Sequence, residues 1–508
     1  MGKLFKAVAF VTIFSVLTRA LGFLLRIYLS RVLGAELLGS YQVAMSIFGV
    51  FLTLVASGLP TIISRSVANL RAKGDSANQF KLVTAGLIVA VTISVVVCFI
   101  VFICPSILNM IFTSSSSTSV LLLLLPGVVA SSVYTILRGA LWGQKKFFSI
   151  SFAEFFEQIV RLIILFILVS LPLNIGLGER AALSLSLACI VSALFVIILY
   201  FAFGGKLANP KGSFVPLLKT STPITAVRTV SGIVSSAISI IIPARLMLYG
   251  YTSSEALAQF GIIMGMTFPL LMIPSTLISS IAVAIIPEIS EQTTNIDIEV
   301  KNTEKLKTQI NLSISLSVII SCVLLPAYIV LGKDIGIFLF SNETAGHYLT
   351  ISAFLMIPMG ISQITSSILN AIGLEIKSLI NYAISALFLF ICIYFLPKYL
   401  GVYALIIGMG GLSIITSILN LSMLHKRKLL NLKLIKIALI MIGMCIPTTL
   451  LGYLTYSLIA KILPLFLALT LGAIICIGTL ILLLLCTNLA NIRGFVFKNK
   501  FKKKTQLN

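Results

Sequence analysis

Arginines within strongly apolar segments are the residues of this chain best suited to chemistry. Arg19 and Arg26 lie seven residues apart in the first apolar segment, so a helix would place both on one face. Arg19 would lie about 16 Å into that segment, near the middle of a bilayer. A central arginine costs about 2.5–3.5 kcal/mol to insert. Arg19 therefore predicts a water-filled cavity or an anionic ligand, whereas Arg26 could instead snorkel to the membrane surface.

Four further arginines complete the predicted binding set. Arg65 and Arg138 lie near the inner ends of the second and fourth apolar segments. Arg228 and Arg245 lie in the seventh, where they could place positive charge opposite Arg19. Snorkelling towards lipid headgroups is the alternative interpretation for each of the four.

The fifth apolar segment carries a charged face formed by Glu154, Glu157 and Arg161. Spacings of three and four residues place all three on one side of a helix. A Glu157–Arg161 pair would neutralise itself and leave Glu154 to respond to protons or ions. These three residues are therefore the predicted place of ion or proton coupling.

Glycine and proline interrupt several of the apolar segments. We expect hinges at Gly58 and Pro60 in the second segment, and at Pro269 and Pro274 in the eighth. Proline removes a backbone donor and kinks a helix, which would serve bending between two open states of a transporter. In a passive bundle the same residues would be packing kinks.

Motifs for catalysis, metals or cofactors do not occur. The two histidines, His347 and His425, are far apart, and the eight cysteines form no Cys-x-x-Cys pair. Neither a Gly-x-Ser-x-Gly motif nor a phosphate-binding loop is found. We therefore expect no enzyme, no metal and no cofactor. The net charge is +23, but the lysines and arginines are not interleaved with aromatic residues. We therefore expect no nucleic-acid partner.

The elements that position these residues must be transmembrane helices. The chain is 59% hydrophobic and 10% charged, against about 25% charged residues in soluble domains. This predicts an all-α polytopic membrane protein with about 14 transmembrane helices. The expected spans are 7–30, 41–68, 83–113, 119–143, 150–171, 181–203, 221–249, 257–286, 311–332, 347–371, 378–396, 401–424, 436–460 and 463–487.

Alternate loops are rich in lysine and arginine, which places both termini in the cytoplasm. The opposite loops hold five basic residues in all, namely Arg31, Arg180, Lys333, Lys398 and Lys461. A bacterial cytoplasmic membrane is the expected location.

Two pseudo-symmetric six-helix lobes are predicted, followed by two extra helices. The expected divisions are 1–205 for helices 1–6, 206–430 for helices 7–12, 431–490 for helices 13–14, and 491–508 for a basic cytoplasmic tail. An internal repeat supports two lobes, because residues 36–45 resemble residues 255–264. Repeated halves are typical of transporters.

Three stretches of sequence carry a family resemblance: 18–41, 57–68, and 137–144 together with the charged face of the fifth segment. They resemble the stage V sporulation protein B family, in the polysaccharide-transport branch of the multidrug/oligosaccharidyl-lipid/polysaccharide exporter superfamily. That family is similar to the lipid II flippases. The resemblance implies a central cationic cavity, alternating access, and arginines that bind the pyrophosphate of an undecaprenyl-linked oligosaccharide. It implies the lipid bilayer as surroundings, a role in spore cortex or cell-wall synthesis, and cell-wall synthases as further candidate partners.

Three alternatives remain open at this point. A drug or cation antiporter of the same fold would need carboxylates within the membrane, and the first segment has arginines in their place. A membrane glycosyltransferase or polymer ligase would need a large outer loop with acidic or histidine residues, and the outer loops are short. A non-transporting scaffold for cell-wall synthases would function normally with Arg19 replaced by alanine.

Overall fold

The computed structural model consists of helices throughout the part of the chain that it describes. That part comprises residues 2–103, 112–280, 300–431 and 433–487, with the single residues 106, 108, 282 and 289 between them. The helices form two compact units, Met1–Gly261 and Ile262–Asn508. The predicted basic tail at 491–508 lies outside the described residues.

Long apolar helices confirm the all-α membrane class. Twelve helical segments in the described residues are long and apolar enough to cross a membrane. One of them, Ile13–Ala72, covers the first two predicted spans, and the predicted fifth span carries too much charge to be among the twelve. The chain is therefore a polytopic membrane protein.

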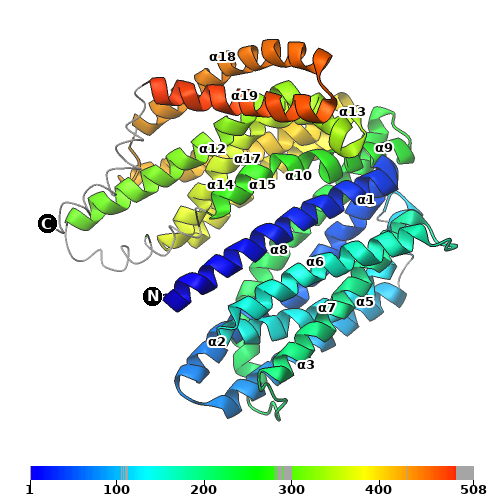
Figure 1. The fold of residues 1–508 in the computed structure, drawn as a ribbon. Coiled ribbons are helices and arrows are strands. Elements are labelled where there is room, and N and C mark those ends of the chain that lie inside the picture. Colours follow the sequence, from blue (N-terminus) through cyan, green and yellow to red (C-terminus); the bar gives the residue numbers. More distant parts are fainter. Residues whose placement is uncertain are drawn as a thin grey trace. The chain divides into compact units, whose positions relative to one another are not determined.

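The first unit begins with α1 (Gly2–Ala56) and α2 (Gly58–Ala72). The chain changes direction within α1 at Gly34, whose φ of 69° is readily available to glycine (Figure 1). The sequence predicted a connecting segment of about ten residues there, and a single glycine makes the turn. The second break falls at Ser57, and Pro60 occupies the first turn of α2, where proline is tolerated.

Among the described residues, the first unit continues with α3 (Ser76–Ile103), α5 (Ser115–Gly143), α6 (Phe147–Ser170), α7 (Leu177–Ala202) and α8 (Phe214–Leu246), followed by the short α9 (Ser253–Gly261). Helix α5 is central, because it packs against α1, α2, α3, α6 and α7. Helix α8 packs on α1 and α2, and α9 packs on α1. The first unit thus extends beyond the predicted division at residue 205, and the division into two six-helix lobes stays a prediction.

Facing glycines allow a close contact between α1 and α9. A Cβ on Gly39 would lie 1.9 Å from the carbonyl oxygen of Leu257, and one on Gly261 would lie 2.2 Å from the carbonyl oxygen of Ala35. Small residues allow such backbone contact between membrane helices. The contact joins the two copies of the internal repeat, since residues 36–45 lie on α1 and residues 255–261 on α9. The two copies of the repeat therefore pack against each other.

The second unit opens with a π-helical turn, Ile262–Thr267, and the short α10 (Phe268–Leu271), which contains Pro269. Pro274 lies in the helical segment just beyond α10. Its longer elements are α12 (Val300–Phe340), α13 (Glu343–Ser352), α14 (Met356–Ala371), α15 (Glu375–Phe395), α17 (Tyr403–Lys426), α18 (Lys433–Ile462) and α19 (Leu465–Cys486). The short α16 (Pro397–Leu400) joins α15 to α17.

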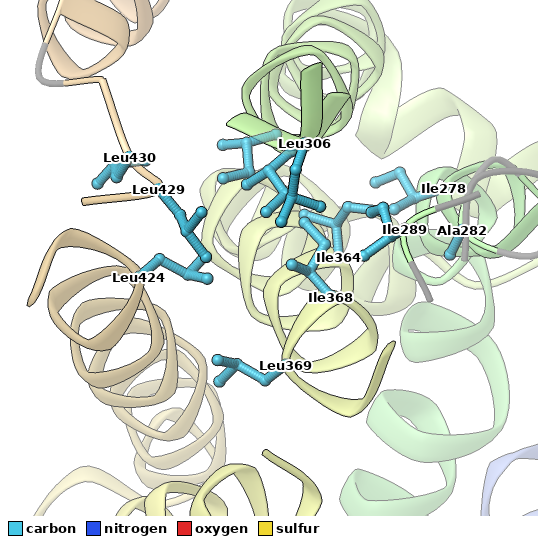
Figure 2. Close-up of a cluster of buried hydrophobic side chains, with 12 residues drawn as sticks. Ile278, Ala282, Ile289, Leu306, Ile364, Ile368, Leu369, Leu424, Leu429 and Leu430 are labelled. Carbon is cyan, nitrogen blue, oxygen red and sulfur yellow. The ribbon is translucent and has the colours of Figure 1, made fainter. Parts of the chain in front are cut away.

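Aliphatic side chains fill the core of the second unit. One cluster joins α12, α14 and α17, and includes Leu306, Ile364, Ile368 and Leu424 (Figure 2). A second cluster fixes the hairpin of α18 and α19 to α12, and there the hydroxyl of Tyr456 donates a hydrogen bond to Asp334. Gly336 on α12 and Gly346 on α13 face each other, because a Cβ on Gly336 would lie 2.3 Å from the backbone nitrogen of Gly346.

Candidate functional site

A polar cavity of about 530 Å³ lies within the first unit. Helix α5 supplies one wall, and α1, α6, α7 and α8 supply the others. The lining residues are Thr18, Leu52, Thr53, Ala56, Ser57, Ser131, Tyr134, Thr135, Arg138, Glu154, Glu157, Gln158, Cys189 and Arg228. Its volume falls in the range of about 300–1,000 Å³ that is usual for ligand sites. We call it the main cavity.

Two of the predicted arginines meet in the main cavity. Arg138 forms an ion pair with Glu154 of α6. Arg228, on α8, donates to the backbone carbonyl of Ser57 over 2.9 Å. That carbonyl lies at the break between α1 and α2, so the predicted break at Gly58 and Pro60 contributes a polar group to the cavity. The hinge role of these two residues stays a prediction.

The carboxylates of α6 pair differently from the sequence-based expectation. Glu154, expected to be left over, is the residue that pairs with Arg138. Arg161, expected to neutralise Glu157, instead donates to the hydroxyl of Tyr41 over 2.9 Å. Within the described residues, Glu157 has no ion pair and lines the main cavity. The charges of Glu157 and Arg161 are close enough to interact, but the hydrogen bond of Arg161 goes to α1 and the ion pair of α6 goes to α5.

Three buried hydroxyls of the main cavity have no hydrogen-bond partner among the described residues. They belong to Thr18, Ser57 and Tyr134. Buried polar groups are nearly always satisfied, so such groups call for a polar ligand or solvent. The formal charges of the cavity balance, with two arginines and two glutamates. The structure thus gives a mixed polar site in this unit, whereas the family resemblance implied a cationic one.

The other predicted arginines lie elsewhere. Arg19 does not line the main cavity, although its neighbour Thr18 does. Arg26 is close enough to Arg161 for their charges to interact. Arg245 lies near the end of α8, about 25 Å along the helix from Arg228 at 1.5 Å per residue. Arg65 lines a second, smaller cavity that it shares with Arg138.

Sequence reasoning missed the polar stripe of α5. Ser131, Tyr134 and Thr135 precede Arg138 at helical spacings, and all four line the main cavity. The signal was present, since these residues fall at i−7, i−4 and i−3 from an arginine within an apolar segment. Small polar residues are common in membrane helices, so the stripe stands out only once Arg138 is known to face a cavity.

Known proteins share this architecture. The fold is similar to that of two solved structures. Lipid II flippase MurJ in an inward closed conformation has a TM-score of 0.72 at 16% identity, covering 92% of this chain and 97% of that one. An inward-facing multidrug resistance transporter of the MATE family has a TM-score of 0.63 at 17% identity, covering 81% of this chain and 94% of that one.

Residues 4–293 match the polysaccharide biosynthesis protein family, and the chain belongs to that family. Stage V sporulation protein B of Bacillus subtilis (strain 168) is 26% identical over 287 residues, or 54% of this chain. The match spans 55% of that relative, so about half of its length is represented. Together with the apolar helices, these findings describe a multi-pass bacterial membrane protein.

Proposed function

We propose that the protein is a flippase that moves a lipid-linked oligosaccharide across the cytoplasmic membrane by alternating access. The substrate that fits best is an undecaprenyl-pyrophosphate-linked peptidoglycan precursor such as lipid II. The observation that carries the proposal is the main cavity, where Arg138 and Arg228 lie beside buried hydroxyls that have no hydrogen-bond partner in the part of the chain that the structure describes. The chain's family and its likeness to a lipid II flippase fold support this choice.

Guanidinium groups suit a pyrophosphate because their planar donors match two phosphate oxygens at once. Arg138 is held by Glu154 in the absence of substrate, so a pyrophosphate would compete with that carboxylate. Within the described residues, the guanidinium of Arg228 is held by a neutral carbonyl alone and needs less energy to redirect. The hydroxyls of Thr18, Ser57 and Tyr134 would complete the polar shell. Arg19 and Arg26 remain proposed contributors from α1.

The test is binding of lipid II and undecaprenyl pyrophosphate to the purified protein in detergent. We expect saturable binding that weakens about tenfold or more in Arg138→Ala and in Arg228→Ala, since a charge-assisted hydrogen bond contributes about 1.5–3 kcal/mol. Arg427→Ala is the matched control, because Arg427 is an exposed arginine at the end of α17. An affinity that neither Arg138→Ala nor Arg228→Ala changes would refute the proposed site.

A second candidate is a drug or cation antiporter of the same fold. The observation that favours it is the pair of carboxylates, Glu154 and Glu157, in the main cavity. Such an antiporter would exchange a cation for protons at these groups. Proteoliposomes with an imposed pH gradient discriminate the two candidates. Cationic dye efflux that Glu157→Gln abolishes would favour the antiporter, and lipid II movement without dye efflux would favour the flippase.

We also propose that both termini lie in the cytoplasm, on the strength of the loop charges. Protease protection of terminal tags in sealed vesicles tests this orientation. Tags cleaved only when the cytoplasmic side is exposed would support it, and cleavage of either tag from the opposite side would reverse it.

A further inference from the structure

A second polar cavity, of about 310 Å³, lies beside the main cavity along α5. It is lined by Thr61, Ser64, Arg65, Arg138, Gly139 and Trp142. Arg138 lines both cavities. We call this second one the tryptophan cavity, because it contains the only tryptophan of the chain.

Two glycines of α5 lie at the contact with α2 beside the tryptophan cavity. Gly139 and Gly143 lie four residues apart on one face of α5 and let α2 approach it. A Cβ on Gly139 would lie 2.7 Å from the carbonyl oxygen of Pro60, and one on Gly143 would lie 2.6 Å from that of Ser64. This close approach brings Arg65 of α2 to the same cavity as Arg138.

The chemistry of the tryptophan cavity combines cations, hydroxyls and an aromatic ring. Arg65 is exposed and pairs with no carboxylate within the described part of the chain. The side chains of Thr61 and Ser64 add hydroxyls. Trp142 is 40% exposed, and Phe147 packs against it edge to face, with ring centroids 5.3 Å apart. Phe147 thus restricts an indole ring that stays accessible from the cavity.

We propose that the tryptophan cavity binds a phosphorylated sugar. The two guanidinium groups would take the phosphate, the indole would take the apolar face of the sugar ring, and the hydroxyls of Thr61 and Ser64 would bond to sugar hydroxyls. A cavity of about 310 Å³ is at the small end of ligand sites and suits one hexose phosphate. This inference rests on the proposed function for its choice of a sugar over other aromatic-binding groups.

The position of the two cavities suggests how a larger ligand would extend. Arg138, which lines both cavities, and Trp142 of the tryptophan cavity are four residues apart on α5, or about 6 Å along the helix axis. A pyrophosphate at Arg138 would therefore have a sugar within reach of Trp142. The tryptophan cavity would then be the subsite that binds the glycan of the ligand whose pyrophosphate lies at Arg138.

Intrinsic fluorescence tests the inference directly, because Trp142 is the only tryptophan. The full-length protein is placed in phosphatidylcholine nanodiscs and titrated with N-acetylglucosamine 1-phosphate. We expect a saturable change in emission, with affinity about tenfold or more weaker in Arg65→Ala and unchanged in Arg427→Ala. Lipid II in the same nanodiscs should also change the emission, because its sugar would occupy the same cavity.

Several results would overturn the inference. An equal response to inorganic phosphate would reduce the cavity to an anion site, and a stronger response to uridine monophosphate would make it a nucleotide site. A response only when phosphatidylglycerol is added would make it a lipid headgroup site. No response to any probe would also refute it.

The failure of this inference is separable from that of the proposed function. Lipid II movement that Trp142→Ala leaves unchanged, but Arg228→Ala abolishes, would leave the flippase standing and remove the glycan subsite. Saturable binding of the sugar phosphate without any lipid movement would keep the subsite and remove the flippase.

Discussion

The contact of α5 with α2 can be tested by adding a single methyl group. In Gly139→Ala the new Cβ would lie 2.7 Å from the carbonyl oxygen of Pro60 and 3.1 Å from its Cα atom. Ordinary van der Waals contact begins at 3.4 Å, so the two helices must separate by about 0.7 Å. Both opposing atoms belong to the backbone and cannot rotate away. Overpacking of this kind costs about 1–3 kcal/mol.

The assay is thermal unfolding of the purified protein in detergent, with sugar phosphate binding measured on the same samples. The matched control is Gly49→Ala in α1, because no atom lies within 4 Å of the Cβ added there. We expect the melting temperature to fall in Gly139→Ala and to hold or rise in Gly49→Ala, since alanine is the better helix former by about 1 kcal/mol. Binding should weaken only in Gly139→Ala, because Arg65 moves away from Arg138.

One result would refute this reasoning. If Gly139→Ala melts and binds like Gly49→Ala, the backbone contact does not set the distance between α2 and α5. The tryptophan cavity would then owe its shape to other contacts.

Three more predictions follow from the charged contacts. A double-mutant cycle of Arg138→Ala and Glu154→Ala should give a coupling of about 1 kcal/mol in unfolding free energy, since both side chains are partly exposed; additive effects would contradict the ion pair. Arg180→Ala should cost about 1–3 kcal/mol and Arg180→Lys should not restore it, because the guanidinium donates to five backbone carbonyls in the last turn of α6 and in the loop after it; melting of both variants checks this. Hydrogen bonds from Asn78 lower the pKa of Asp75 in the turn before α3, so its contribution to stability is full above the ordinary aspartate pKa and is lost as pH falls through the lower folded value. Melting from pH 6 down to about pH 2 should show less acid dependence in Asp75→Asn, and an unchanged profile would count against it.

The sequence was sufficient for the fold class because hydropathy dominates in a membrane protein. Backbone groups in lipid must bond within their own helix, so a long apolar segment has few alternatives. The turn at Gly34 was harder to foresee. A glycine followed by ordinary helical residues looks like part of a longer connecting segment, and only its φ of 69° identifies a sharp change of direction.

The site was only partly predictable, for a geometric reason. Spacing along one helix identified Glu154, Glu157 and Arg161 as one face. It favoured a pair four residues apart, whereas Arg138 on α5 takes Glu154 and Tyr41 on α1 takes Arg161. Which face of one helix meets which face of another depends on interhelical packing, and a single sequence does not specify the rotation of each helix.

The facing glycines of both units have a consequence for natural variation. At Gly39 and Gly261, and again at Gly336 and Gly346, the added methyl group would meet backbone atoms of the opposing helix. Glycine is the smallest residue, so no further substitution in the opposing helix can make room for a larger side chain at either glycine of a pair. A mutational scan should record these positions as intolerant as any ligand contact, although they touch no ligand. Intolerance at these four glycines would report the spacing between helices and not contact with a ligand.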